Sequence, residues 1–171
     1  QQADDSKPKY DEELETWVAP FFMAPINTKN IHRSNKLMNH IYGEDFQYNE
    51  MWISGPGDEG KTAAEMIASA NPIGGEDAPK PGEGPSREKR ENGNYDILFC
   101  ADIDNEVVKV SVSGDMDPGY GSTSKMITES AVCLVKEADD LPGGIYTPAS
   151  SLGIKLIKRL EDNAGLTFRV E

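Results

Sequence analysis

The stretch Gly114-Asp115-Met116-Asp117-Pro118-Gly119-Tyr120-Gly121-Ser122-Thr123 joins an alternating strand pattern to an amphipathic helical pattern. Its glycines allow positive φ and a close approach of the backbone, and its proline fixes φ and removes a donor. Ser122 and Thr123 are good N-cap residues, and the free N–H groups at a helix start attract anions. The stretch therefore predicts a strand-to-helix turn that is either an anion cradle or plain architecture.

The segments before this turn predict a β-hairpin. Residues 95–101 and 106–113 are two strand patterns joined by a short polar turn, and valines alternate with polar residues in the second. Earlier in the chain, residues 26–42 have helical spacing, residues 46–53 alternate as a half-buried strand, and residues 62–70 predict a short helix.

The segments after the turn predict two helices and a last strand. Residues 122–138 are helical. Its predicted inward stripe is Met126, Ile127, Ala131, Leu134 and Val135. Thr147 begins a further helix, Gly165 stops it, and residues 166–170 form a short strand. Between the two halves, residues 73–93 are rich in proline and glycine and predict a long irregular crossing, with Ser86 as the cap of one helical turn.

This order of elements predicts an α+β fold, with an antiparallel or mixed sheet of about four or more strands and helices packed mainly on one face. We expect residues 1–16 to form a flexible tail and residues 17–171 to form a single domain. A length of 171 residues is enough for one domain with a real core.

Composition excludes some classes of partner. The net charge of −13 argues against a nucleic-acid partner, which would need a basic surface. The cysteine and histidine spacing fits no zinc site, so we expect no metal. Cys100 and Cys133 lie in apolar runs, which predicts buried free thiols and a cytoplasmic location, with peripheral membrane association left open.

Two polar motifs have competing interpretations. Residues 55–62 match the P-loop pattern GxxxxGK[ST], but the preceding strand is polar and Asp58 and Glu59 would lie where phosphates must bind. We therefore favour a solvated turn, with Thr62 as the helix cap, over a nucleotide site. Arg33 and Asn35, in a polar cluster on the first helix, either bind a carboxylate or phosphate or form a solvent-exposed face.

Four ordered blocks resemble one family. They are Trp17–Glu50 with Trp17-Val18-Ala19-Pro20 and His32-Arg33-Ser34-Asn35, then Pro81–Gly93, then Gly114–Ala131, and last Thr147–Phe168. Together they resemble the C-terminal part of the saccharopine dehydrogenase-like oxidoreductases, the group that includes trans-acting enoyl reductases. The resemblance runs from about residue 17 to the end of the chain.

The resemblance implies a longer parent protein, an NAD(P)-dependent oxidoreductase whose N-terminal Rossmann domain is absent here. In this interpretation the chain is the substrate-side domain and is inactive alone. It has no dinucleotide fingerprint and binds no cofactor by itself. The resemblance also implies a homodimer. A non-enzymatic interaction or dimerisation module is the alternative. No catalytic residue can be carried over. The residues expected to line the substrate cleft are Arg33, Asn35, Asp117, Tyr120, Ser122, Thr123 and Lys125.

Overall fold

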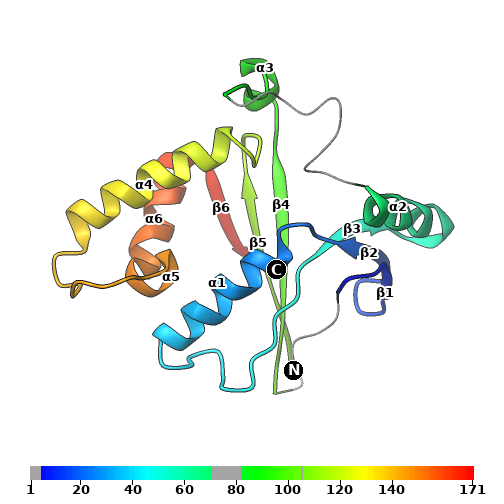
Figure 1. Cartoon of the computed structure of the whole chain (residues 1–171), viewed down its shortest axis with the longest axis horizontal. Helices are drawn as coiled ribbons and strands as arrows, with labels where there is room; N and C mark the ends of the chain where they lie inside the picture. Colours follow the sequence, from blue (N-terminus) through cyan, green and yellow to red (C-terminus); the bar gives the residue numbers. More distant parts are fainter. Residues whose placement is uncertain (1–4, 71–81, 105) are drawn as a thin grey trace. The chain divides into compact units, whose positions relative to one another are not determined.

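The computed structural model describes residues 5–70, 82–104 and 106–171, and it has an α+β fold, as predicted (Figure 1). Over these residues it contains six helices and two three-stranded antiparallel sheets. The chain divides into two compact units, residues 1–78 and 79–171. The strands are therefore shared between two small sheets, one in each unit, where a single sheet was expected.

The sheet of the N-terminal unit has the order β1-β2-β3. These strands are Lys9–Asp11, Thr16–Pro20 and Met51–Gly55. Val18 and Ala19 are buried, and Tyr10 packs edge-on against Trp17 of the neighbouring strand. Residues 1–16 were expected to be a flexible tail, but strand β1 lies within this range. Its residues pair with those of β2.

Helix α1, Ala24–Leu37, ends earlier than the predicted range of 26–42. Asn39 and His40 take left-handed φ values of 57° and 59°, and the His40 N–H donates to the Asn35 carbonyl at 2.8 Å. The predicted strand 46–53 begins only at Met51. Its first half instead packs on α1: the ring of Phe46 contacts His32.

Helix α2, Gly57–Ser69, begins directly after β3 and packs against β2 and β3. The expected turn over residues 55–60 is therefore largely helical, and Thr62 does not cap the helix. Its hydroxyl donates to the Asp58 carbonyl inside the second turn. This early start depends on Gly60, because a Cβ there would overlap the carbonyl of Gly55.

The C-terminal unit contains the predicted hairpin and a third strand. Strands β4, Tyr95–Ile103, and β5, Glu106–Gly114, pair along their whole length. Strand β6, Leu166–Val170, adds to β5 only from Val110 to Gly114. The order β4-β5-β6 therefore leaves the far half of the hairpin two-stranded.

Four helices complete this unit. They are α3 (Arg87–Glu91), α4 (Gly121–Glu137), α5 (Pro148–Ser151) and α6 (Gly153–Ala164). Three of the predicted helix boundaries are confirmed: the Ser86 side chain accepts from the Lys89 N–H, Thr147 forms a capping box with Ser150, and Gly165 ends α6 at φ 72°.

The core of the C-terminal unit lies where α4 and α6 meet the sheet (Figure 1). Its buried members are Cys133, Leu152, Leu156, Leu160, Ala164 and Leu166. Both cysteines are free, and Cys133 is buried as expected. Cys100 is exposed, contrary to the prediction, because it pairs with Lys109, on the face of β4–β5 opposite Val112 and the core.

The predicted inward stripe of α4 is also wrong in part. Met126 packs against the core, but Ile127, Leu134 and Val135 are exposed to 68%, 53% and 77%. Cys133 takes the buried position instead. The buried face of α4 is therefore rotated away from the most apolar stripe of its sequence.

Candidate functional site

The turn between β5 and α4 folds around the carboxylate of Asp117. One carboxylate oxygen accepts from the N–H groups of Gly119 (3.1 Å) and Tyr120 (3.0 Å), and the other accepts from Gly121 (2.6 Å). The Ser122 N–H donates to the Asp117 carbonyl at 2.9 Å. The amides that could have cradled an external anion therefore already bind a carboxylate of the chain itself.

Ser122 and Thr123 hold this turn in place, and neither is the helix cap. Ser122 is fully buried, and its hydroxyl shares a 2.8 Å hydrogen bond with the phenol of Tyr95. The Thr123 hydroxyl donates to the Pro118 carbonyl at 2.6 Å. Tyr120 occupies the N-cap position without capping through its side chain.

The segment around α3 packs against the turn. The Asp117 N–H donates to the Arg90 carbonyl at 3.0 Å, and a Cβ on Gly93 would lie 2.6 Å from the Asp117 nitrogen. A Cβ on Gly84 would lie 3.4 Å from the ring of Tyr120. Sequence reasoning did not place these residues beside the turn, because no local signal links segments about 30 residues apart.

An ion pair lies at the edge of the same turn. The Lys125 ammonium is 3.5 Å from the Asp115 carboxylate, and a Cβ on Gly165 would overlap that carboxylate. The pair is exposed, and exposed pairs contribute little to stability. Both charges therefore remain accessible to a ligand. With Tyr120, 53% exposed, they are the functional groups that the turn presents.

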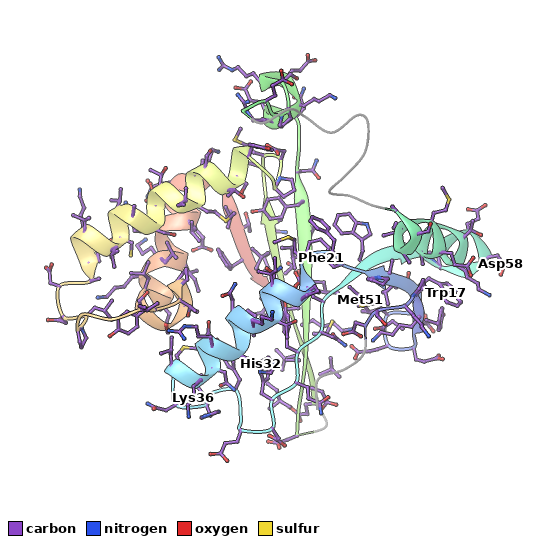
Figure 2. All side chains as sticks on the ribbon, in the orientation of Figure 1. Trp17, Phe21, His32, Lys36, Met51 and Asp58 are labelled. Atoms are coloured by element: carbon purple, nitrogen blue, oxygen red, sulfur yellow. The ribbon has the colours of Figure 1, made fainter. Side chains whose placement is uncertain are left out.

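Arg33 and Asn35, the two remaining candidates, belong to the N-terminal unit. Asn35 is buried, and both ends of its amide are hydrogen-bonded: its nitrogen donates to the Gly43 carbonyl (2.8 Å) and its oxygen accepts from the Tyr42 N–H (2.9 Å). Asn35 therefore holds the loop after α1. Arg33 is exposed on α1. Figure 2 shows the neighbouring side chains of His32 and Lys36 on the same helix.

A polar cluster between α1 and the segment before β3 was not singled out in the sequence. The Asn27 amide donates to the Glu50 carboxylate at 3.0 Å. Burial, the largest cause, acts together with the charge of Glu50 and a hydrogen bond with it to raise the pKa of Tyr48 to about 12. This network fixes the segment against α1.

The glycine-rich turn after β3 fits a second pattern that the sequence interpretation missed. Gly55, Gly57 and Gly60 have the GxGxxG spacing of dinucleotide-binding turns. Gly55 and Gly57 have positive φ, and Gly60 allows the helix to approach the strand. However, β3 pairs antiparallel with β2, and Asp58 and Glu59 occupy the first turn of α2. An anion would be repelled there, so the geometry supports close packing and not phosphate binding.

Among the described residues, no group of three or more His, Cys, Asp or Glu side chains is placed to hold a metal ion. No helix in the described part of the chain is long and apolar enough to cross a membrane. Two shallow hollows lie on helix surfaces, one beside Asp58 and Met66 on α2 and one beside Ala131 and Val135 on α4.

Comparison with known proteins finds trans-acting enoyl reductases among the relatives of this chain. A Mycobacterium tuberculosis protein provisionally named a trans-acting enoyl reductase is 32% identical to the chain. Trans-acting enoyl reductases of Mycobacterium ulcerans and Mycobacterium bovis are each 29% identical. Each match covers 84% of this chain but only 39% of the relative. No family model and no solved structure matches the chain. The chain is therefore a distant homologue of part of the proteins named trans-acting enoyl reductases.

Proposed function

We propose that this chain is the C-terminal, substrate-side part of a saccharopine dehydrogenase-like, NAD(P)-dependent oxidoreductase. The observation that carries the proposal is the match to 39% of the length of longer proteins named enoyl reductases. A chain that corresponds to a minor part of such a protein can hold only some of its functions. The fold agrees with this division, because both sheets of the described residues are antiparallel, whereas a Rossmann cofactor domain needs a parallel sheet.

In this proposal the turn around Asp117 is one side of the substrate cleft. The self-capped turn is rigid, since its own carboxylate satisfies its amides. It presents the Tyr120 phenol and the Lys125 ammonium to solvent. A phenol can donate a hydrogen bond to the carbonyl oxygen of an enoyl thioester, where negative charge develops when hydride reaches the β-carbon. NADPH, held by a Rossmann domain, would supply that hydride.

The first test asks whether this chain binds the cofactor. Titration calorimetry of the chain with NADPH should show no binding, because the glycine-rich turn before α2 carries Asp58 and Glu59 at the phosphate position. Tight binding would contradict the division of function. If binding occurs, Lys61→Ala distinguishes a P-loop site from other sites.

The second test uses the longer protein that the proposal implies. NADPH oxidation with an α,β-unsaturated thioester should slow in Tyr120→Phe and Arg33→Ala, while circular dichroism stays unchanged. Tyr146→Phe, in the same unit but outside the turn, is the matched control. Wild-type rates in both variants would reduce Tyr120 and Arg33 to structural residues.

A non-enzymatic interaction or dimerisation module is the second candidate. The exposed apolar residues of α4 favour it. An upstream segment with a strand, a glycine-rich loop and a helix in the encoding gene would decide for the oxidoreductase.

A further inference from the structure

One segment, residues 82–93, contacts Tyr120 in two ways, and the first contact is with its ring. A Cβ on Gly84 would lie 3.6, 3.4 and 3.5 Å from Cδ1, Cε1 and Cζ, three consecutive atoms of the Tyr120 ring. Similar distances to three consecutive atoms place this position over the face of the ring and not beside its edge. The hydrogen that Gly84 carries in place of a Cβ therefore points at the ring face.

The second contact is with the backbone of the turn and reaches Tyr120 through Asp117. The Arg90 carbonyl accepts from the Asp117 N–H at 3.0 Å, and a Cβ on Gly93 would lie 2.6 Å from the Asp117 Cα. The Asp117 carboxylate in turn accepts from the Tyr120 N–H at 3.0 Å. The segment therefore fixes Asp117, and Asp117 fixes the point from which the Tyr120 side chain leaves the backbone.

The side chain of Arg90 joins these two contacts. Its guanidinium donates to the Pro85 carbonyl, beside Gly84, at 3.0 Å. The ring of Pro85 fixes its own φ, and the Ser86 side chain caps the helical turn between Pro85 and Arg90. The residue that contacts the Tyr120 ring and the carbonyl that binds Asp117 are therefore tied together within one short loop.

We propose that residues 82–93 position the Tyr120 phenol, with Gly84 and Arg90 as positioning residues. The inference rests on the proposed function, in which this phenol donates a hydrogen bond to the oxygen of an enoyl thioester. An exposed side chain changes rotamer within nanoseconds, whereas a donor to a developing oxyanion is most effective in one fixed position. The contact with Gly84 restrains a ring that is still 53% exposed.

The ring explains why residue 84 is a glycine. Its φ is not in the left-handed region, so the backbone does not require glycine there. An alanine methyl would make ordinary contact with the ring, but the two γ-methyls of a valine, on a stiff χ1, would displace it. Gly143 lies in the same unit, and a Cβ there meets nothing within 4 Å, so Gly143→Val is the matched control.

The first part of the test is NMR spectroscopy of this chain and needs no activity. A Gly84 Hα should be shifted upfield by the ring and should show a nuclear Overhauser effect to it, and Tyr120→Leu should abolish the shift. Arg90→Met removes the bond to Pro85, so the shift should move most of the way to its Tyr120→Leu value. Arg87→Met, which removes only an exposed pair with Glu91, is the control and should leave the shift unchanged.

The second part measures kcat and KM of the longer protein with NADPH and an α,β-unsaturated thioester. Gly84→Val and Arg90→Met should lower kcat on the order of 10- to 100-fold, because a small misplacement of a reacting group has effects of this size. KM should stay near the wild-type value, since no group that binds the ground state is removed. Gly84→Ala should be nearly as active as wild type, and Gly143→Val should match it. A merely structural role would lower the melting temperature without this split between kcat and KM.

The outcomes separate this inference from the proposed function. If Tyr120→Phe is slow but Gly84→Val and Arg90→Met keep the wild-type kcat, the positioning role is overturned and the proposed function stands. If Tyr120→Phe keeps the wild-type kcat, the proposed role of the phenol is overturned, and the NMR shift alone decides whether the segment holds the ring. A Gly84 Hα without an upfield shift in the wild-type chain, or an unchanged shift in Arg90→Met, would overturn the inference whatever the rates.

Discussion

Replacing Asp117 tests whether one carboxylate organises the turn before α4. In Asp117→Ala, the N–H groups of Gly119, Tyr120 and Gly121 lose their acceptor. Loss of a side-chain cap costs about 0.5–2 kcal/mol. Gly119 and Tyr120 are exposed, so water replaces the carboxylate there, but Gly121 is buried and its unpaired N–H adds about 1–3 kcal/mol. The total expected loss is roughly 1.5–5 kcal/mol.

Amide hydrogen exchange read by mass spectrometry suits this prediction, because it resolves local opening. The free energy of opening should fall by this amount in a peptide over residues 114–124 and stay unchanged over α2. The free energy of opening of Asp117→Asn should lie between those of wild type and Asp117→Ala. The asparagine amide keeps one acceptor oxygen, but it has a donor NH₂ group in place of the second oxygen. Asp140→Ala, at an exposed carboxylate beyond α4, is the control. A loss below about 0.5 kcal/mol in Asp117→Ala, equal to that of the control, would refute the capping role.

Two further outcomes follow from the N-terminal unit. Gly60→Ala should destabilise the chain by about 2–3 kcal/mol in urea unfolding followed by far-UV circular dichroism, which reports on both units, because the added methyl overlaps the Gly55 carbonyl. Gly143→Ala, where a Cβ meets nothing within 4 Å, should be near neutral, and equal losses would contradict the packing argument. The Tyr48 pKa of about 12 lies above the usual tyrosine pKa of about 10, so the unfolded chain releases this proton first and stability should fall as pH rises from 10 toward 12. Tyrosinate absorbance should show one late-titrating group that Tyr48→Phe removes and Glu50→Gln shifts to lower pH; an unchanged titration in both variants would contradict it.

Sequence predicted the elements that local signals determine. The β4–β5 hairpin, the Ser86 and Thr147 caps and the Gly165 stop each depend on a few adjacent residues. The short strand β2 escaped prediction because Pro20 lies within it.

Tertiary contacts decided what sequence could not. Helix α1 stops early because the side chain of Asn35 binds the loop that follows it. On α4, the buried residues and the exposed apolar residues both have helical spacing, so periodicity could not show which of the two sets faces the core. Arg159 of α6 binds Glu129 and Glu137 and so holds their side of α4 inward. At the candidate site, Tyr120, Lys125 and Asp117 stay predictions as cleft residues, and the sequence did not show that the Asp117 carboxylate is the internal acceptor of the turn.

The strand order of the C-terminal unit has a consequence for how this unit folds. Strands β4 and β5 are neighbours in the sequence and can pair early, on the microsecond scale of hairpins. Strand β6 joins β5 only after the chain has passed through α4, α5 and α6, so its pairing closes a loop of about 50 residues and carries that entropy cost. The sheet should therefore be completed last, from its C-terminal side. A chain emerging from the ribosome would carry an unfinished sheet edge at β5 until β6 is made.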